Sequence, residues 1–321
     1  MPKNKPTVLQ TEPIHARFQK LLEKQARVIR PAGYSEDQLA EAARDAEGIL
    51  IRTKGLVSAK IIAAAPRLKV VGRHGVGLDH IDIPAATKAG VWVVYTPAGS
   101  LDAVAEHTWT MILTLAKRAV IGNAAVRAGN FAARNQESLQ LKGKMLGVLG
   151  LGRIGTRVAE IAVHGFGMRV QYTDLLRYPK KEKALGAKKV TLKRLLATSE
   201  VVTIHVPLDE STHGLLGARE LAWMRRDGYL INCARGGVVD SLALAAALKA
   251  GTLAGAGLDV FEPEEPPLDH PLLQCANAIL SPHNAAQTAE ARFNYAQVIF
   301  DILRVLKGQK PQWPANAPAK R

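Results

Sequence analysis

The first hundred residues alternate short apolar runs with segments whose apolar residues recur at helical spacing. Three runs, 48–52, 68–71 and 91–95, are rich in β-branched residues and end at Gly, Pro or a polar residue. Such runs are typical of buried parallel strands. An alanine-rich segment, 58–65, is predicted to be a helix between two of them. This alternation predicts βα units and a parallel sheet.

The second part of the chain begins with a long amphipathic helix, predicted from Ser100, which we interpret as the crossing between two domains. A last helix, about 289–306, ends near Gly308 and is predicted to return to the first domain. That return would make the first domain discontinuous. Between these helices lies a second series of predicted strands, mostly separated by helices, which indicates a doubly wound sheet. These strands are 146–149, 169–173, 201–205, 229–232, 255–259 and 278–281.

Length and composition indicate an ordinary globular chain. Its 321 residues, 47% of them hydrophobic, are enough for two cores at roughly 100–200 residues each. No run approaches the roughly 18 apolar residues of a membrane span, and we expect neither a signal peptide nor a membrane association. Two cysteines, Cys233 and Cys275, give no disulfide framework, so a reducing, cytoplasmic compartment is predicted.

The chain is strongly basic, with a net charge of +15 from 43 basic and 28 acidic residues. This charge favours anionic partners, including nucleic acid and phosphorylated metabolites. The densest basic run extends from Arg177 to Arg194, and we interpret it as a solvated face. Aromatic residues form only 5% of the chain, which weakens an interpretation as a single-strand-binding surface. No nucleic-acid partner is therefore predicted.

A glycine-rich turn, G-L-G-R-I-G, follows the strand 146–149 and opens a helix, the context of a dinucleotide-binding turn. Gly150 permits the tight turn, Gly152 lets the backbone approach a pyrophosphate, and Gly155 lets helix and strand pack closely. The pyrophosphate would lie at a helix N-terminus. Asp174, nineteen residues after Gly155, would accept hydrogen bonds from the ribose hydroxyls and repel a 2′-phosphate, which predicts NAD rather than NADP.

Three residues of the second half carry the chemistry of hydride transfer to a 2-keto acid. Arg235, in N-C-A-R-G-G, follows the strand 229–232, and its planar fork suits a bidentate grip on a carboxylate. His283, in S-P-H-N, follows the strand 278–281 and can exchange a proton near neutral pH. Glu264 would orient the ring of His283 and raise its basicity.

Each assignment has an alternative in the sequence itself. Arg235 taken alone would be a surface arginine beside a Gly-Gly turn. Glu262 and Glu265 lie in the same Pro-rich loop as Glu264, and spacing does not choose among the three. Other histidines compete with His283, and the one in the nearest polar loop is His270. The competing histidines are His15, His74, His80, His107, His164, His205, His213 and His270.

These motifs, taken together, resemble those of the D-isomer-specific 2-hydroxyacid dehydrogenases almost from end to end. The resemblance implies an α/β fold of two doubly wound parallel-sheet domains with a cleft between them, and usually a homodimer. It places a Rossmann-type NAD domain at 99–286 and a discontinuous, flavodoxin-like substrate domain at 1–98 and 287–321. The matching stretches are V-G-R-H-G-V-G-L-D-H-I-D (71–82), L-G-L-G-R-I-G (149–155), N-C-A-R-G-G-V-V-D (232–240), G-L-D-V-F-E-P-E (257–264) and S-P-H-N-A-A (281–286).

The resemblance also implies residue roles. The catalytic set would be Arg235, Glu264 and His283, because the acid of this family comes five residues after the aspartate that matches Asp259. Asp259 would hold the nicotinamide carboxamide, and no metal is predicted. The predicted cofactor-binding residues are Val76, Gly150, Gly152, Arg153, Ile154, Gly155, Asp174, His205, Val206, Pro207, Cys233, Ala234, Arg235, Asp259 and His283.

Within the family, the chain looks most like the phosphoglycerate dehydrogenases. The stretch L-I-R-T-K (50–54) resembles their R-S-x-T-K region, whose arginine helps to grip the substrate phosphate. The turn R-H-G-V-G (73–77) resembles the loop whose backbone N–H groups face the substrate carboxylate. Two features depart from the pattern: the chain of 321 residues carries no regulatory C-terminal domain, and His74 replaces a small residue. The predicted substrate-binding residues are Arg52, Arg73, His74, Gly75, Val76 and Gly77.

Two functions from different classes follow from the sequence. The first is an NAD-dependent dehydrogenase of a small 2-hydroxy acid, with 3-phosphoglycerate and phosphohydroxypyruvate as the best guess. Reductases of glyoxylate or hydroxypyruvate and dehydrogenases of sulfolactate-type acids share the same framework. The second is an NAD(H)-sensing partner of transcription on the same fold, because a fold alone does not fix a function. The complete Arg-Glu-His set favours the enzyme.

Overall fold

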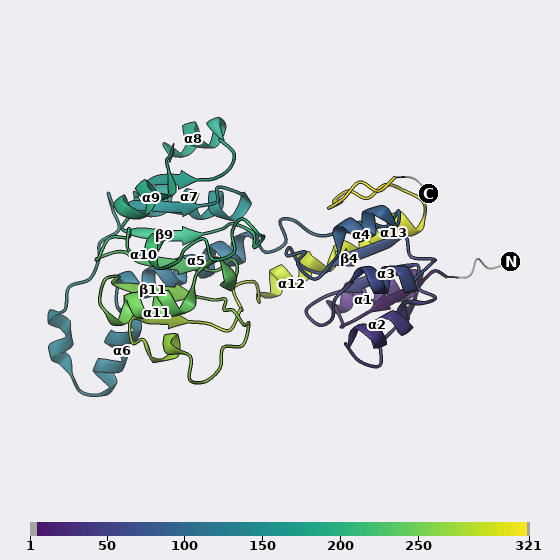
Figure 1. The fold of residues 1–321 in the computed structure, drawn as a ribbon, viewed down its shortest axis with the longest axis horizontal. Coiled ribbons are helices and arrows are strands. Elements are labelled where there is room, and N and C mark those ends of the chain that lie inside the picture. Colours follow the sequence, from purple (N-terminus) through teal and green to yellow (C-terminus); the bar gives the residue numbers. More distant parts are fainter. Residues whose placement is uncertain (1–4, 320–321) are drawn as a thin grey trace. The chain divides into compact units, whose positions relative to one another are not determined.

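The chain forms two compact units, and the structure, a computed structural model, describes residues 5–319. One unit comprises Met1–Ser100 and Gln287–Arg321, and the other comprises Leu101–Ala286 (Figure 1). The first division falls after Ser100, whereas the sequence analysis expected it after residue 98. Both units are parallel α/β sheets covered by helices, which confirms the predicted fold class. Among the described residues, no helix is long and apolar enough to span a membrane.

The first unit contains a five-stranded parallel sheet of order β2-β1-β3-β4-β5, the order of flavodoxin-like folds. Its strands are β1 (Thr7–Gln10), β2 (Arg27–Ile29), β3 (Gly48–Ile51), β4 (Val70–Arg73) and β5 (Trp92–Val94). Its helices are α1 (Ala16–Gln25), α2 (Glu36–Ala43), α3 (Ala59–Ala64), α4 (Ile83–Lys88), α12 (Ala289–Ala296) and α13 (Val298–Leu306).

The C-terminal segment packs on this sheet as two helices, where the sequence analysis expected one. The chain tightens at Gln297, whose N–H donates to Asn294 and whose carbonyl accepts from Phe300, so both bonds span three residues instead of four. No Pro or Gly stands at this point, and the sequence therefore gives no signal for the break. Beyond it, α13 packs on β4, where a Cβ on Gly72 would lie 2.4 Å from the Cδ1 atom of Ile302.

The second unit contains a seven-stranded parallel sheet of order β12-β11-β10-β9-β6-β7-β8. The first strand of this unit, β6, lies in the interior of the sheet between β9 and β7. The strand order reverses between β6 and β9, as in a dinucleotide-binding sheet. Its strands are β6 (Met145–Leu149), β7 (Arg169–Thr173), β8 (Lys188–Lys189), β9 (Val201–Ile204), β10 (Tyr229–Asn232), β11 (Gly255–Leu258) and β12 (Ala278–Leu280).

Helices cover both faces of this sheet, which explains why an inner strand such as β6 is apolar without alternation. α5 (Leu101–Ala116) and α7 (Arg153–Phe166) pack on one face, and α9 (Leu192–Thr198), α10 (Ala218–Leu221) and α11 (Ser241–Lys249) on the other. This unit has five further helical elements among the described residues. They are α6 (Ala119–Arg127), α8 (Pro179–Leu185), η1 (Phe131–Asn135), η2 (Gly236–Val238) and η3 (Pro271–Gln274).

Candidate active site

The glycine-rich turn connects β6 to α7, and two of its glycines are required by the fold itself. Gly150 has a φ of +93°, and a Cβ there would lie 2.9 Å from the carbonyl group of His205. A Cβ on Gly155 would lie 2.1 Å from the carbonyl oxygen of Gly150. A larger residue at position 150 would therefore push the turn away from the end of β9. A larger residue at position 155 would push α7 away from the turn.

Gly152 has a different reason for being glycine. A Cβ there would meet no heavy atom of the described residues within 4 Å, so packing within the protein does not require glycine at this position. Gly152 is also the N-cap of α7, and no described side chain caps that helix end. The first N–H groups of the helix and its dipole therefore face an open site that suits a pyrophosphate. The turn fits the dinucleotide that the sequence predicts.

Asp174 follows β7 and adjoins this turn. One carboxylate oxygen accepts from the N–H of Leu151 at 2.8 Å, and the other accepts from the N–H of Leu176 at 3.0 Å. Each oxygen keeps further acceptor capacity, because a carboxylate can accept about four hydrogen bonds. Asp174 thus stabilises the turn and can still bind ribose hydroxyls, which fits NAD.

His283 lies just after β12 in a left-handed conformation, with a φ of +49°. Its backbone N–H donates to the carbonyl oxygens of Asp259, at 2.8 Å, and of Ser281, at 3.1 Å. The Asp259 carboxylate accepts from the N–H groups of Asn284 and Ala285, both at 2.9 Å, and from the Ser281 hydroxyl. The turn that presents the imidazole is thus held by a carboxylate beneath it.

Asp259 is completely buried. Its burial by itself would raise the pKa of the carboxyl group, but hydrogen bonds from His107, Ser281, Ala285 and Asn284 hold it below its usual value. The group therefore stays ionised within the protein, and in this structure its hydrogen bonds are directed to the 281–285 turn. Its contact with the nicotinamide carboxamide stays a prediction.

Two further members of this network were missed by the sequence analysis. His107, on α5, lies with its Nε2 atom 2.9 Å from the Ser281 hydroxyl and 3.4 Å from the Asp259 carboxylate. Sequence reasoning treated His107 only as a competitor of His283 and gave Ser281 no role. The pairing spans 174 positions of the chain, and one sequence contains no signal for a contact at that separation.

The acidic loop after β11 provides one partner for each of two histidines. The Glu264 carboxylate contacts Nδ1 of His283, so Nε2 is the ring nitrogen that remains for proton exchange. Glu262 instead lies 3.2 Å from Nε2 of His213, a pair in which both side chains are largely exposed. The geometry thus places Glu264, and neither of its two acidic neighbours, on His283.

Arg235 follows β10 in a loop that packs against this acidic loop. A Cβ on Gly236 would lie 2.1 Å from the carbonyl group of Phe261, and one on Gly237 would lie 2.5 Å from a carboxylate oxygen of Glu262. The Gly-Gly pair therefore permits the close approach of the two loops. Asn232 fixes the Arg235 backbone by donating its side-chain amide to the Arg235 carbonyl at 2.9 Å.

The sheet order explains how the three candidate residues come together. β10, β11 and β12 are adjacent and parallel, and Arg235, Glu264 and His283 follow their carboxyl ends in that order. Neighbouring strands are about 4.8 Å apart, so the three residues arise from an edge about 10 Å wide. One edge of one sheet thus carries an arginine and a histidine whose imidazole contacts a carboxylate.

Other titratable groups of the candidate set are unsuited to proton transfer. Loss of water around the ring lowers the pKa of His205 to about 3. Burial and the nearby Arg52 and Arg73 lower the pKa of His74 to about 4, so both histidines stay neutral at pH 7. Burial raises the pKa of Cys233 to about 12, which leaves it a thiol. These three residues can therefore have a structural or steric role in the site, but they are unsuited to acid–base catalysis.

The predicted carboxylate-binding loop lies in the first unit, directly after β4. Gly75 has a φ of +155°, which a glycine adopts without strain, and its N–H donates to the Arg73 carbonyl at 3.0 Å. The Arg73 side chain donates through Nε to the carbonyl of Gly77 at 2.8 Å. His74 is buried and packs edge-on against Tyr295, with ring centroids 5.5 Å apart.

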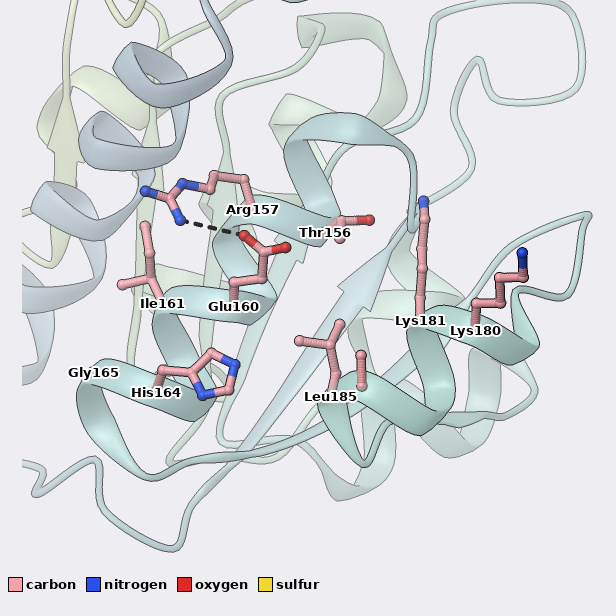
Figure 2. A pocket seen from close by; sticks show the side chains of 10 residues that line it. Thr156, Arg157, Glu160, Ile161, His164, Gly165, Lys180, Lys181 and Leu185 are labelled. Carbon is pink, nitrogen blue, oxygen red and sulfur yellow. Dashed lines mark hydrogen bonds and ion pairs between the residues drawn. The ribbon is translucent and has the colours of Figure 1, made fainter.

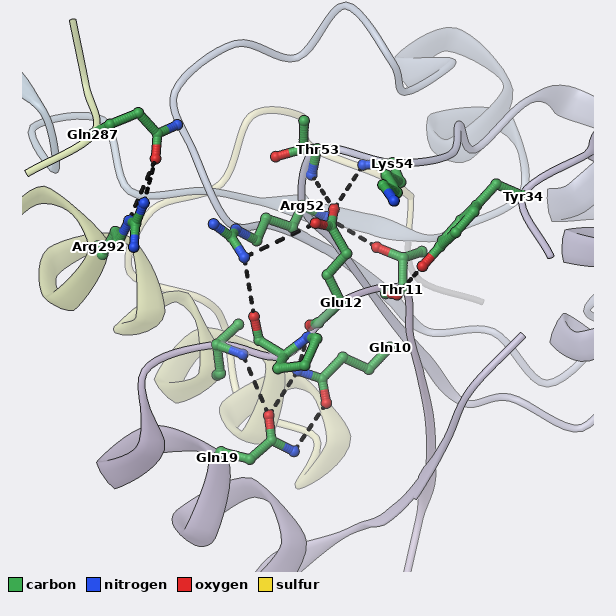
Figure 3. Close-up of polar contacts among 12 residues, drawn as sticks. Gln10, Thr11, Glu12, Gln19, Tyr34, Arg52, Thr53, Lys54, Gln287 and Arg292 are labelled. Carbon is green, nitrogen blue, oxygen red and sulfur yellow. Dashed lines mark hydrogen bonds and ion pairs between the residues drawn. The ribbon is translucent and has the colours of Figure 1, made fainter. Parts of the chain in front are cut away.

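Arg52 follows β3 in the same unit and is already engaged (Figure 3). Its guanidinium donates to the Pro13 carbonyl at 3.3 Å and lies 3.9 Å from the Glu12 carboxylate. Glu12 also accepts from the N–H groups of Thr53 and Lys54, both at 2.7 Å. An anion that binds at Arg52 therefore has to share this cation with Glu12.

Fold and site together define an NAD-binding protein of the two-unit, parallel-sheet type, with a histidine–glutamate pair at the edge of its dinucleotide sheet. The family model described as "D-isomer specific 2-hydroxyacid dehydrogenase, NAD binding domain" matches residues 109–285. The chain belongs to this family of NAD-dependent oxidoreductases. This membership confirms the recognition made from the motifs, and the description of the family model supports NAD as the cofactor.

Individual relatives match most of the chain. It is 37% identical to a D-3-phosphoglycerate dehydrogenase of Methanocaldococcus jannaschii, over 97% of this chain and 59% of that protein. It is 41% identical to a glyoxylate reductase of Thermofilum pendens, over 86% of this chain and 83% of that protein. The crystal structure of D-lactate dehydrogenase from Aquifex aeolicus, complexed with NAD and lactic acid, superimposes with a TM-score of 0.84 and 31% identity, covering 98% of this chain and 100% of that chain. The chain thus spans little more than half the length of the phosphoglycerate dehydrogenase that it resembles.

Proposed function

We propose that this protein transfers a hydride between NAD and a small 2-hydroxy or 2-keto acid, with Arg235, Glu264 and His283 as its catalytic residues. The observation that carries the proposal is the presence of all three at the carboxyl ends of adjacent strands in the sheet that bears the dinucleotide turn. A protein that only senses NAD(H) has no need of the imidazole–carboxylate pair. The enzyme is therefore favoured over the sensor.

The proposed mechanism assigns one task to each group. NAD supplies or accepts the hydride when bound. Arg235 holds the carboxylate of the substrate through two parallel hydrogen bonds. In reduction, Nε2 of His283 donates a proton to the keto oxygen, and in oxidation it takes the proton back. Glu264 holds Nδ1, so that the ring is oriented and its protonated form is stabilised.

For the substrate, we propose 3-phosphoglycerate and phosphohydroxypyruvate first. The proposal is supported by two arginines, Arg52 and Arg73, at the ends of adjacent strands β3 and β4, and by the name of the Methanocaldococcus jannaschii relative. A smaller keto acid such as glyoxylate or hydroxypyruvate is the second candidate. It is supported by the engagement of Arg52 with Glu12 and by the glyoxylate reductase relatives. Sulfolactate-type acids would use the same cations.

The decisive experiment for the reaction measures NADH oxidation by the purified protein with phosphohydroxypyruvate, hydroxypyruvate, glyoxylate, pyruvate and sulfopyruvate. A dominant rate with one acid would establish the reaction and its substrate. NADH binding without turnover of any acid would speak against the dehydrogenase and would return weight to the sensor.

Replacing Arg52 with glutamine tests the phosphate assignment directly. If Arg52 grips a phosphate, the KM for phosphohydroxypyruvate is expected to rise at least about 10-fold, because a charge-assisted hydrogen bond is lost. The KM for glyoxylate, which has no phosphate, serves as the internal control and is expected to stay within about 2-fold. Equal effects on both acids would show that Arg52 acts on the loop and not on a phosphate.

We infer that the protein assembles as a homodimer through α6 and η1. None of the described residues of α6 or η1 is buried within the chain, and Figure 1 shows this segment at the periphery of its unit. Val120, Val126 and Phe131 expose 53%, 55% and 64% of their surface. A second copy of the chain could bury this apolar surface by symmetric pairing of the same face.

Replacing Val126 and Phe131 together with aspartate is expected to convert the dimer to a monomer, measured as mass by light scattering at micromolar concentration. Two charges in an apolar interface leave unpaired groups without water, which opposes association. Leu242→Asp, on α11 and 61% exposed, is the matched control and is expected to leave the mass unchanged. An unaltered dimer in the double variant would exclude this face as the interface.

We also propose a reducing, cytoplasmic location. Cys233 and Cys275 are both buried, and neither forms a disulfide bond. Free thiols of this kind are typical of proteins in a reducing compartment.

A further inference from the structure

The carbonyl groups of the dinucleotide turn are held from outside the turn. Thr156, on α7, donates its hydroxyl to the carbonyl oxygens of Gly152, at 2.5 Å, and Leu151, at 3.3 Å. The Nζ atom of Lys181, on α8, donates to the same two oxygens, at 2.7 Å to Leu151 and 3.3 Å to Gly152. Two helices thus converge on the same pair of peptide groups.

The geometry of the peptide bond makes these contacts consequential for the opposite face of the turn. In a trans peptide the C=O and N–H groups are coplanar and point in opposite directions. The Leu151 carbonyl shares its peptide with the N–H of Gly152, and the Gly152 carbonyl shares its peptide with the N–H of Arg153. A cation that holds both carbonyls on one side therefore directs both N–H groups to the other side, where a pyrophosphate would bind.

Lys181 itself lies in a defined position at the edge of a groove of about 610 Å³ between α7 and α8. Figure 2 shows its side chain extending toward the turn, whereas its neighbour Lys180 points away from it. The Lys181 ammonium also lies 4.2 Å from the centroid of the Tyr178 ring. Burial lowers the pKa of Lys181, with the Asp174 carboxylate acting in the opposite direction. The ammonium has lost part of its water and depends on these contacts.

The start of α8 is anchored so that Lys181 reaches the turn. The Glu182 carboxylate accepts from the Tyr172 hydroxyl at 2.7 Å, and Arg177 donates to both oxygens of the same carboxylate. The Tyr172 hydroxyl in turn accepts from the N–H of Tyr178 at 3.1 Å. Tyr172 is a fully buried residue of β7, so α8 is fixed to the strand beside the turn.

We propose that Lys181 is a positioning residue for cofactor binding, which orients the N–H groups of the dinucleotide turn by holding its carbonyls from behind. This assigns a specific task to one cation of the basic run that the sequence analysis interpreted as a solvated face. The other lysines of that run, at 180, 183, 188, 189 and 193, are exposed and agree with that interpretation. The inference rests on the cofactor-binding part of the proposed function and not on the identity of the keto acid.

The test compares Lys181→Met with Lys180→Met, an adjacent substitution that removes the same charge from the same groove without a bond to the turn. Affinity for NADH is measured by fluorescence titration, so that no turnover is needed. Lys181→Met is expected to weaken NADH about 10-fold, because it removes charge-assisted hydrogen bonds, while Lys180→Met stays within about 2-fold of the wild type. Lys181→Arg keeps a cationic donor and is expected to recover part of the loss.

Two further readouts separate positioning from general damage. ADP-ribose, which carries the pyrophosphate, is expected to lose affinity in Lys181→Met as NADH does, whereas adenosine is not. At saturating NADH the kcat is expected to match that of Lys180→Met. Equal NADH affinity in the two methionine variants, or equal losses for ADP-ribose and adenosine, would overturn the inference. Absence of keto acid turnover with the affinity difference intact would overturn only the proposed reaction.

Discussion

Replacing His283 with asparagine is expected to lower kcat for keto acid reduction by about 10²–10⁴-fold, the usual contribution of a positioned general acid. Asparagine is the preferred variant because residue 283 has a φ of +49°, a conformation that asparagine adopts more readily than alanine. The turn that carries residue 283 is fixed by its backbone and by Asp259, and neither contact involves the imidazole. The variant is therefore expected to keep its fold and lose the proton donor.

The measurement is steady-state NADH oxidation with the best acid from the substrate panel, together with NADH affinity by titration. Affinity for NADH is expected to stay within about 3-fold, because most of the predicted cofactor contacts lie elsewhere. His164→Asn, on the exposed end of α7, is the matched control and is expected to be fully active. A His283→Asn protein with near-normal kcat would remove His283 from the mechanism and leave the His213–Glu262 pair to be tested.

The sequence could predict those residues of the site that come directly after a strand. Arg235 and His283 follow β10 and β12 by only a few residues, and parallel strands direct their carboxyl ends to one edge. Periodicity located those strands to within a residue or two. The same reasoning placed the glycine turn, because the positive φ of Gly150 and the crowding at Gly155 are local properties of a β-turn-α unit.

What the sequence could not predict depends on side chains that meet across long separations. The bond between His107 and Ser281 joins α5 to the strand end at β12. The engagement of Arg52 by Glu12 joins the ends of β1 and β3, which are adjacent in the sheet. The contacts between these two strand ends span 39 to 42 positions of the chain. Lys181 was hidden in a basic run, because charge alone does not show which lysine faces a carbonyl. Only the folded arrangement separates it from Lys180.

Replacing Arg235 with lysine is expected to reduce kcat/KM for the keto acid by about 100-fold, although the positive charge is kept. Lysine presents a point charge and cannot form the two parallel hydrogen bonds with which a guanidinium holds a carboxylate. Loss of one charge-assisted bond and of the fixed orientation corresponds to about 3 kcal/mol of transition-state stabilisation. The effect belongs to the substrate, so affinity for NADH is expected to stay within about 3-fold.

The matched control is Arg219→Lys on α10, a surface arginine paired with its neighbour Glu220, and it is expected to be fully active. A second arm uses Arg235→Ala with added guanidinium ion. Partial recovery of kcat/KM by guanidinium, with none by ammonium, is expected if the planar fork is what the carboxylate requires. Equal kcat/KM in the Arg235→Lys and Arg219→Lys proteins would show that Arg235 supports the Gly236–Gly237 turn and does not bind substrate.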